Sequence, residues 1–576
     1  MKFDDILLTI GEFGPFQIRI FLLISFAAIP TALHHLSQVF LAGQSDHWCA
    51  VPELDSINCT DGGIIDDRLC QEAKRNATIP CTKSDCTEFA KCDRYDISEL
   101  YFSPGDIQDV NSTSSIACDA GWVYDRSMYH SSIISEFDLV CDRKTLPRIA
   151  QSIYFAGVLI GSVLFGSMAD WIGRYLTFFI CVLMEVVLGV AVAFSPDFIT
   201  YTVFRFFLSM CNMGLFLMAF VIVTEIAGPS KRVIAGVAIE FYFASGYMLL
   251  ALAAYFVRDW RTLQLVLTIP VALFAFLIPI LTESPRWLIS RGKYGKAETI
   301  LRKVADVNQK RLPIPLFEEV EVNKHLEILR TERQPSVLDL YKTPNLRAKT
   351  LNLMWNWCVN SLVYYGLSLS TSNLGGDQYV AFFISGAVEV PAYLYSLIAI
   401  ELFGRKINLA GTMIIGGFAC FATIFIPLGV WRTTVAMIGK FCIAASFAIT
   451  YVFAAELYPT PVRSAGMGIS SMSARIGGIL APLILVLGDY WKPLPLIIFG
   501  ACSISAGLLA LILPETKGKA LPETLQEGEL FGKRHQTTTN GNEEKQDGAF
   551  NTDINGDTKR ASLDGTDNPT FEDAHL

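Results

Sequence analysis

The amino-acid sequence predicts an all-α membrane protein that crosses the bilayer twelve times, in two parallel six-helix halves. Three observations predict this fold: the composition is strongly apolar, twelve apolar runs are long enough to span a membrane, and three motifs recur at one spacing. Hydrophobic residues make up 52% of the 576 residues and charged residues only 18%, whereas a soluble globular chain has about 25% charged residues. The mean hydropathy is +0.40.

Each predicted span is a run of about 20 mostly apolar residues, the length that a helix needs to cross the hydrocarbon core. The runs occupy residues 17–42, 150–169, 176–195, 199–224, 234–256, 263–281, 350–369, 378–400, 409–428, 434–455, 464–487 and 493–512. A chain with so many spans is predicted to be a multi-pass membrane protein with lipid around it.

Basic residues mark one side of the predicted bilayer. They occur in segment 282–349 and in three short loops, at Lys231, Arg232, Arg405, Lys406 and Arg463. The opposite loops contain fewer, at Arg258, Arg261, Arg432 and Lys492. Because Lys and Arg favour cytoplasmic loops, an even number of spans places both termini in the cytoplasm. The acidic start MKFDD lacks the basic region of a cleaved signal peptide.

The first half is predicted at residues 17–281, after a cytoplasmic segment 1–16, and contains a long polar loop at 43–149. Eight cysteines lie in this loop: Cys49, Cys59, Cys70, Cys81, Cys86, Cys92, Cys118 and Cys141. This even number indicates up to four disulfides in an oxidising compartment, in any connectivity. The loop also contains three glycosylation sequons, at Asn58, Asn76 and Asn111. A zinc module fits less well, because the loop has no CxxC pair.

The charged segment 282–349 separates the halves and contains the helical pattern KYGKAETILRKVADVNQKR. It predicts a cytoplasmic helical linker, followed by the second half at 350–512. Residues 513–576 form a tail that is polar from residue 520 on, and the sequence predicts that it is cytoplasmic and disordered. Its KRASL stretch offers Ser562 to a basophilic kinase, although an inert tail is the favoured interpretation.

Three motifs of the first half recur in the second. Gly173-Arg174 recurs as Gly404-Arg405, Glu225 and Arg232 as Glu456 and Arg463, and Glu283 as Glu515, at separations of 231, 231 and 232 positions. A duplicated six-span unit explains one common spacing, and an even number of spans gives both copies the same topology. We interpret these turns as cytoplasmic gating latches, in which arginines pair with carboxylates such as Asp170, Glu225 and Glu456 at neighbouring helix ends. Purely structural pairs are the alternative.

Charged side chains also occur deep inside the predicted spans. Arg475 is the only charged residue between Met467 and Leu487, and its nearest ionisable flanks are Arg463 and Asp489. At about 1.5 Å of rise per residue, these flanks are about 18 Å or more away, too far for the side chain to reach the interface. Glu185, Glu240, Glu389 and the pair His34-His35 are similarly deep. Such residues usually face a bundle interior or a cavity, so Arg475 is either a substrate contact or the partner of Glu389 or Glu240.

Aromatic residues follow one face of several spans at helical spacing. They are Phe243 and Tyr247 near Glu240, Phe447 and Tyr451 in span 10, and Trp357 and Tyr364 beside Asn360 and Ser361 in span 7. Aromatic faces and a carboxylate favour an ammonium group, whereas the planar fork of Arg475 suits a carboxylate. The sequence therefore predicts a site for an amphoteric or anionic small molecule. No nucleotide loop, metal cluster or nucleophile arrangement indicates an enzyme, and no cofactor is expected.

From GEFGPFQ through GSMADWIGR, TESPRWLISRGK and AVEVPAYL to AAELYPTPVRSAGMG and LPETKG, the chain resembles the organic cation, organic anion and carnitine/zwitterion transporters of the major facilitator superfamily. The resemblance covers roughly residues 1–520. Cation-selective members have an aspartate where this chain has Arg475, and anion and carnitine members have an arginine. Tyr393, in place of the lysine of anion carriers, resembles the carnitine branch. Leu215-Phe216 departs from it, because carnitine carriers have Asn-Tyr there, and Glu240 is also unusual for the family.

The resemblance implies a plasma-membrane transporter of small organic cations or zwitterions, working by alternating access. Arg475 would hold a carboxylate, Trp357, Phe447, Tyr451, Phe243 and Tyr247 would surround the ammonium group, and Glu240 or Glu389 would supply negative charge. An organic anion carrier that uses Arg475 is the first alternative, and a receptor-like protein without transport is another. No nucleic-acid partner is expected. Homo-oligomerisation through the cysteine-rich loop and coupling to Na⁺ or H⁺ stay open.

Overall fold

We analysed a computed structural model of the chain, which describes residues 3–52, 75–76, 78–82, 89–96, 114–314, 316–317, 337–371, 374–519 and 521–532. All of them belong to one compact unit, Met1–Gly532. The predicted glycosylation sites Asn58 and Asn111, the cysteines Cys59, Cys70 and Cys86, and Ser562 lie outside the described residues.

Six helical spans make up the first half. Their elements are α2 (Pro15–Ser25), α3 (Ala28–Leu36) and α4 (Gln38–Leu41), which together form the first span, and then α7 (Leu146–Ile172), α8 (Arg174–Ala193), α9 (Phe198–Ile226), α10 (Arg232–Phe256), and α11 (Trp260–Thr268) with the 3-10 helix η3 (Ile269–Leu277). Long apolar stretches with few helix breakers favour these helices, and Asp197 caps α9 through the backbone amides of Ile199 and Thr200, each at 2.9 Å.

The second half repeats this arrangement with α16 (Pro344–Leu369), α17 (Gln378–Ala387) and α18 (Glu389–Phe403), α19 (Arg405–Phe425), α20 (Val430–Leu457), α21 (Arg463–Val486) and α22 (Leu494–Ala510). Among the described residues, ten helices are long and apolar enough to cross a membrane. The other two of the twelve predicted spans correspond to α16, which is richer in polar residues, and to α22, a shorter apolar helix of 17 residues. α16 begins before the predicted start of its span at residue 350.

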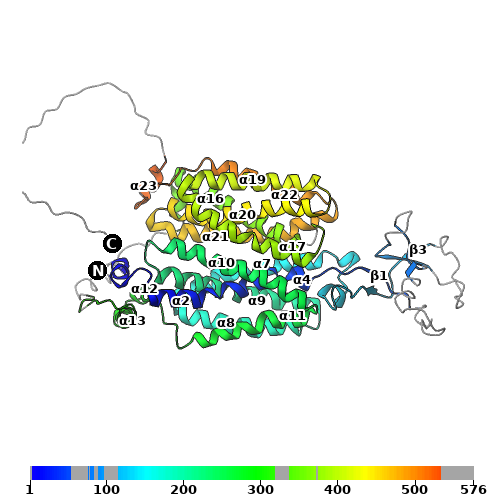
Figure 1. Cartoon of the computed structure of the whole chain (residues 1–576), viewed down its shortest axis with the longest axis horizontal. Coiled ribbons are helices and arrows are strands. Elements are labelled where there is room, and N and C mark those ends of the chain that lie inside the picture. Colours follow the sequence, from blue (N-terminus) through cyan, green and yellow to red (C-terminus); the bar gives the residue numbers. More distant parts are fainter. Residues whose placement is uncertain are drawn as a thin grey trace, which may run out of the picture. The chain divides into compact units, whose positions relative to one another are not determined.

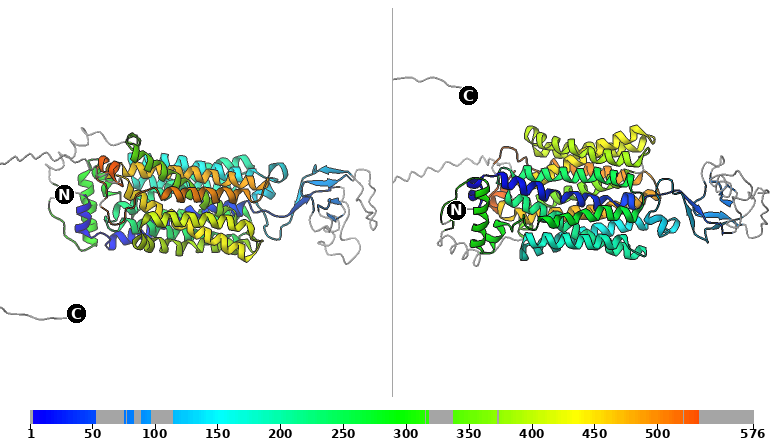
Figure 2. Two further views of the ribbon diagram at one scale, coloured as in Figure 1. Left: turned by 90° about the horizontal axis from the view of Figure 1, so that it is seen from above. Right: turned by 60° about the horizontal axis from the view of Figure 1, so that its bottom comes forward.

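The two halves form two layers of helices that run side by side (Figures 1 and 2). Helices of the two halves pack against each other: α7 packs against α21, and α10 packs against α17 and α18. Close packing requires glycine at the interfaces; a Cβ atom on Gly386 would lie 2.8 Å from the ring of Tyr247. A large cluster of buried apolar side chains includes residues of both halves, so the halves share one core.

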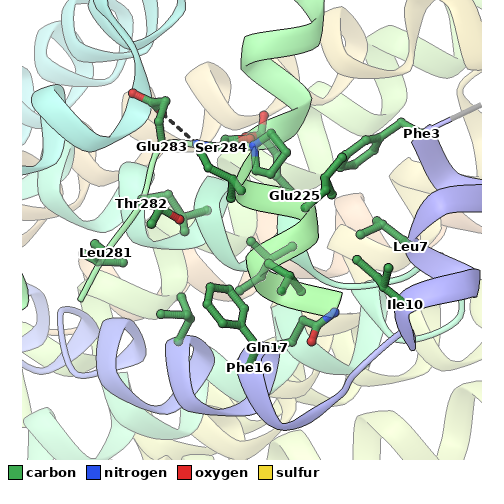
Figure 3. Close-up of a pocket in the computed structure, with 17 residues that line it drawn as sticks. Phe3, Leu7, Ile10, Phe16, Gln17, Glu225, Leu281, Thr282, Glu283 and Ser284 are labelled. Carbon is green, nitrogen blue, oxygen red and sulfur yellow. Dashed lines mark hydrogen bonds between the residues drawn. The ribbon is translucent and has the colours of Figure 1, made fainter. Parts of the chain in front are cut away.

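One end of the bundle, which we call the terminus end, holds the N-terminal helix and the connection between the halves. There α1 (Phe3–Ile10) packs its apolar face against α13 (Tyr294–Val307), which follows α12 (Pro285–Ser290). The Asn308 side chain accepts a hydrogen bond from the amide of Phe16 at 3.0 Å and donates to Gln17 at 2.8 Å. The hollow between these elements is shown in Figure 3 and measures about 30 Å³. A space of that size holds at most a few water molecules, and the side chains that line it are mostly apolar.

The beginning of the C-terminal tail is folded, which corrects the prediction that the tail is disordered from residue 513. Residues Leu525–Leu530 form helix α23. The ammonium group of Lys349, on α16, donates hydrogen bonds to the carbonyls of Gly528 and Phe531, at 2.9 and 2.6 Å. This contact is hard to predict from the sequence, because the carbonyl groups at the end of α23 accept hydrogen bonds from a residue far away in the chain. Residues 533–576 are not described.

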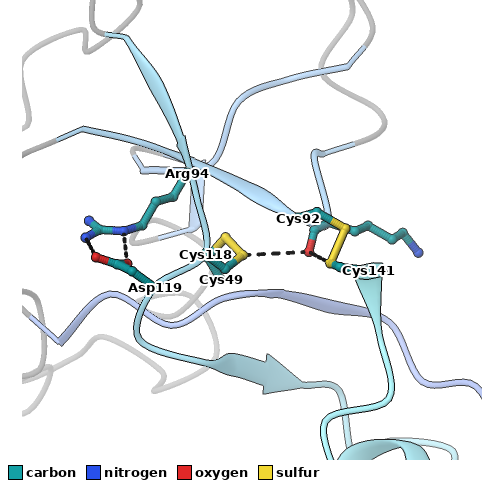
Figure 4. The surroundings of a disulfide bond; sticks show 7 residues. Cys49, Cys92, Arg94, Cys118, Asp119 and Cys141 are labelled. Atoms are coloured by element: carbon teal, nitrogen blue, oxygen red, sulfur yellow. Dashed lines mark hydrogen bonds and ion pairs between the residues drawn. A yellow bond between two sulfur atoms is a disulfide. The ribbon is translucent and has the colours of Figure 1, made fainter. Parts of the chain in front are cut away.

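At the opposite end, which we call the disulfide end, the loop after the first span forms two small antiparallel sheets. β1 (His47–Cys49) pairs with β4 (Trp122–Tyr124), and β2 (Asp93–Tyr95) pairs with β3 (Ser115–Ala117). Disulfides join Cys49 to Cys118 and Cys92 to Cys141 (Figure 4). Cys81 is also disulfide-bonded, and the sequon residue Asn76 is exposed.

Candidate functional site

Arg475 lies midway along α21 and has no ion pair with any residue that the structure describes. Its Nη2 atom is 3.6 Å from the Met213 sulfur of α9, in the other half, and its Nε atom is buried without a hydrogen-bond partner among the described residues. The side chain is half-buried. Neither Glu389 nor Glu240, the partners considered from the sequence, forms a salt bridge with it. A desolvated guanidinium without a carboxylate is costly, which favours a site whose partner is a bound molecule.

The close packing of α21 on α16 helps to position this arginine. A Cβ atom on Gly477, two residues after Arg475, would collide with the backbone oxygen of Cys358 on α16. Ser473 donates a hydrogen bond to the backbone oxygen of Met354, also on α16, at 2.9 Å. The SARIGG sequence therefore brings the two helix backbones together around Arg475.

Three of the predicted aromatic residues form one cluster beside Arg475. The Trp357 ring on α16 contacts the Tyr451 ring on α20 edge to face, with centroids 4.2 Å apart, and lies 6.0 Å from Phe447. Phe447 and Tyr451 are 5.7 Å apart. Arg475 acts electrostatically on Tyr451 and on Tyr365. We call Trp357, Phe447 and Tyr451 the aromatic cluster.

Phe243 and Tyr247 on α10 do not join this cluster. Phe243 contacts the imidazole of His35 edge to face at 6.4 Å. Tyr247 packs on Phe382 of α17, with centroids 4.3 Å apart, and its hydroxyl is 3.0 Å from that of Ser385. These two residues therefore line the interfaces of α10 with α3 of the first half and with α17 of the second.

Glu389 is paired with a residue that our sequence reasoning missed, Lys440 on α20. The Lys440 Nζ atom is 2.9 Å from Glu389 Oε1, and both side chains are almost completely buried. The hydroxyls of Tyr364 and Tyr393 also donate hydrogen bonds to the carboxylate, at 2.6 and 3.1 Å. Lys440 was detectable as a basic residue inside the apolar run 434–455, in the same way as Arg475.

Glu240 is a half-buried carboxylate on α10, and none of the described residues forms a hydrogen bond or an ion pair with its side chain. It interacts electrostatically with both Glu389 and Arg475. The structure thus brings one unpaired guanidinium and one unpaired carboxylate to the same central region.

The remaining predicted intramembrane charges form a second buried network, in the first half. Asn212 donates a hydrogen bond to Glu185 at 2.8 Å, and His34 Nε2 is 3.8 Å from the same carboxylate oxygen. Tyr154 contacts His35 at 3.2 Å. Arg205, which the sequence reasoning also missed, donates to Ser37 at 3.2 Å and stacks over Tyr154, 4.8 Å from the ring centroid.

The two predicted latches have matching geometry at the terminus end. In the first half, Arg174 Nη2 is 3.0 Å from Asp170 and 3.1 Å from Glu225, and Glu283 accepts a hydrogen bond from the Arg174 amide at 2.9 Å. In the second, Arg405 is 2.9 Å from Glu456, and Glu515 accepts from the Arg405 amide at 2.9 Å. Gly173 and Gly404 both have positive φ, of 111° and 88°, a conformation that favours glycine.

Arg232 and Arg463, the other predicted latch residues, bind differently. Arg232 forms an ion pair with Asp4 at 2.5 Å and donates to the backbone oxygen of Thr224. Arg463 donates to the backbone oxygen of Tyr458 at 3.2 Å. Arg232 and Arg463 thus bind backbone oxygens at the ends of α9 and α20, while Arg174 and Arg405 bind the repeated carboxylates of Glu225 and Glu456.

Comparison with known proteins identifies the family. Residues 117–527 match the model of the sugar (and other) transporter family. The chain is 41% identical to the organic cation transporter protein of Drosophila melanogaster, over 96% of this chain and 99% of that one. It is 35% identical to the human organic cation/carnitine transporter 2, over 95% of this chain and 97% of that one.

Among solved structures, the fold is similar to that of the proton:xylose symporter XylE, with a TM-score of 0.55 and 17% identity, covering 88% of this chain and 99% of that one. At this identity the likeness shows the major facilitator fold alone. This likeness confirms the predicted fold. The family model and the relatives confirm the predicted family, whose members are transporters and not enzymes. The chain belongs to the organic cation/carnitine transporters of the sugar (and other) transporter family.

Proposed function

We propose that this protein moves small organic zwitterions of the carnitine or betaine type across the plasma membrane, with both termini in the cytoplasm. The observation that carries the proposal is the unpaired guanidinium of Arg475. A planar guanidinium holds a carboxylate through two parallel hydrogen bonds. The similarity to organic cation/carnitine transporters supports this substrate class.

The cationic end of such a substrate would lie against the aromatic cluster and Glu240. Aromatic faces attract a quaternary ammonium group, and a carboxylate nearby adds to that attraction. Phe447 and Tyr451 are half-buried, so their rings are not fully covered by protein. Glu240 has no partner among the described residues that would neutralise it.

Transport would follow from rocking the two halves about this site. Contacts between the halves support a closed disulfide end: Arg148 and Asp489 form an ion pair at 2.8 Å. Tyr129 donates a hydrogen bond to Gln378 at 2.9 Å, and the rings of Phe40 and Tyr379 stack with centroids 5.4 Å apart. These contacts must break when the disulfide end opens, while Arg174 and Arg405 would act as latches at the terminus end. Self-association through the loop at 43–149 stays a prediction.

The experiment that tests the proposal is uptake of labelled carnitine, tetraethylammonium and p-aminohippurate in cells that express the wild type, Arg475→Ala or Arg475→Lys at matched surface levels. We expect saturable carnitine uptake that Arg475→Ala abolishes and Arg475→Lys only partly restores, because lysine cannot form the bidentate pair. Saturable uptake of p-aminohippurate alone would instead identify an organic anion carrier. Equal tetraethylammonium uptake in wild type and Arg475→Ala, without carnitine uptake, would contradict a zwitterion site.

A further inference from the structure

The surroundings of Glu389 have the composition of an ammonium-binding site. Its two carboxylate oxygens accept hydrogen bonds from the hydroxyls of Tyr364 and Tyr393. The rings of Tyr364 and Tyr247 face the ion-pair partner of this carboxylate. All four side chains are buried. A carboxylate surrounded by the faces of tyrosine rings attracts a cation. The surroundings of Glu389 therefore form a cation-binding site, and not only one side of an ion pair.

The cation in this site belongs to the chain itself. The Nζ atom of Lys440 is 2.9 Å from Glu389 Oε1, 3.2 Å from the centroid of the Tyr364 ring and 5.2 Å from that of Tyr247. It also donates a hydrogen bond to Ser368 Oγ at 2.5 Å. Lys440 therefore makes the contacts that a substrate ammonium group would make, on the carboxylate that the sequence offered for that role.

This site adjoins the one proposed for the substrate. The ring of Tyr364 lies 6.0 Å from that of Phe447, a member of the aromatic cluster. Glu240 interacts electrostatically with Glu389 on one side and with Arg475 on the other. Among the described residues, Lys440 and Arg475 thus bring two basic side chains to this region and Glu389 and Glu240 two acidic ones, and their formal charges cancel.

We propose that Lys440 determines which net charge a substrate must have to be transported. Its ammonium group occupies the Glu389 site and leaves Arg475 and Glu240 as the charges that a substrate meets. The inference rests on the proposed function and adds to it the residue that decides between a zwitterion and a simple cation. With Lys440 in place, one guanidinium and one carboxylate favour a net-neutral molecule. Without it, the site has one excess negative charge and an open ammonium pocket.

The test compares Lys440→Met with Lys440→Arg, and measures the ratio of tetraethylammonium to carnitine uptake at equal surface expression. Methionine is similar in length and apolar, whereas arginine keeps the charge. We expect Lys440→Met to raise this ratio by about tenfold, which corresponds to one modest charge interaction in a partly desolvated site. Lys440→Arg should leave the ratio within about twofold of the wild type. An unchanged ratio in Lys440→Met would overturn the proposal.

A second variant covers the case in which Lys440→Met does not reach the surface. In Lys440→Met/Glu389→Gln both charges are removed, so the net charge of the region is that of the wild type. We expect the wild-type ratio in this double variant. A shift toward tetraethylammonium as large as tenfold would show that charge balance is not the cause, and would also overturn the proposal.

A binding measurement separates failure of this inference from failure of the proposed function. The thermal midpoint of the purified protein is measured with tetraethylammonium and with carnitine, for the wild type and the Lys440 variants. If the wild type transports neither probe, the proposed function fails. The inference still predicts that tetraethylammonium raises the midpoint of Lys440→Met more than that of the wild type, and an equal shift in both would contradict it.

Discussion

Lys440 and Arg475 are basic residues on neighbouring spans of the second half, α20 and α21, and their surroundings differ. Lys440 is almost completely buried and has a carboxylate at 2.9 Å, a hydroxyl at 2.5 Å and a tyrosine ring. Arg475 is half-buried, has no ion pair with a described residue, and contacts the Met213 sulfur at 3.6 Å and the hydroxyl of Tyr451. A basic residue inside an apolar run therefore does not by its position alone reveal its role.

The difference separates two reasons for placing a charge inside a membrane protein. A fully satisfied pair offsets its own desolvation cost and holds helices together. A charge without a protein partner retains that cost until something else binds to it, so it belongs to a site. On this basis we propose that Lys440 stabilises the protein and sets the charge balance, while Arg475 contributes mainly to binding.

The largest expected effect comes from removing the acidic partner of Lys440. Glu389→Ala leaves a buried ammonium group with only Ser368 and two tyrosine faces. We expect a loss of about 3–5 kcal/mol in the free energy of unfolding, the usual cost of an orphaned buried charge. It is measured as a lower thermal midpoint in detergent and as lower surface expression. Glu240→Gln is the matched control. An equal loss of stability there would mean that the pair of Glu389 and Lys440 does not account for the effect.

Removing Lys440 is expected to cost less. In Lys440→Met the carboxylate of Glu389 keeps its two tyrosine donors, Tyr364 and Tyr393. We expect a destabilisation of about 1.5–3 kcal/mol, the range for hydrogen bonds to charged groups. The same thermal measurement applies. A greater loss of stability in Lys440→Met than in Glu389→Ala would show that Glu389 depends on Lys440 more than Lys440 depends on Glu389, the opposite of what we expect.

Arg475 provides the contrast in stability. Since no described residue pairs with it, we expect Arg475→Met to change the free energy of unfolding by less than about 1 kcal/mol, although it abolishes carnitine binding. Thermal unfolding without substrate and carnitine uptake are compared in one preparation. A loss of several kcal/mol would show that Arg475 is structural after all.

Glu515, a carboxylate at the membrane edge, gives the smallest effect. It tests whether the contrast between paired and unpaired charges depends on burial. Burial favours the neutral form of Glu515, but hydrogen bonds from the amides of Arg405, Lys517, Lys406 and Thr516 outweigh it, so its pKa lies below the ordinary value of 4.5. The stabilisation is then fully present above pH 4.5 and is lost as the pH falls through the lowered pKa. Glu515→Gln should flatten the thermal midpoint against pH below 4.5 and leave its pH dependence above 4.5 unchanged. An altered slope at neutral pH would contradict this assignment.

Fold and family could be predicted from the sequence because both depend on local or periodic signals. Apolar runs of about 20 residues specify spans, and the repeated Gly-Arg turns specify the duplicated half. The deep position of Arg475 was also visible, since an isolated charge in an apolar run is a local feature. The tail was mispredicted because α23 is stabilised by Lys349, a distant residue.

The sequence by itself determined that this protein is a helical transporter with charges inside the membrane, because hydrophobicity and spacing are properties of the chain. Only the tertiary structure decided which charge meets which. Glu389 could have paired with Arg475, or with no residue at all, until the packing of α16, α18 and α20 brought Lys440, Tyr364 and Tyr393 around it. Ion pairing depends on distances of a few ångströms between residues far apart in the chain, and that information arises only when the helices pack.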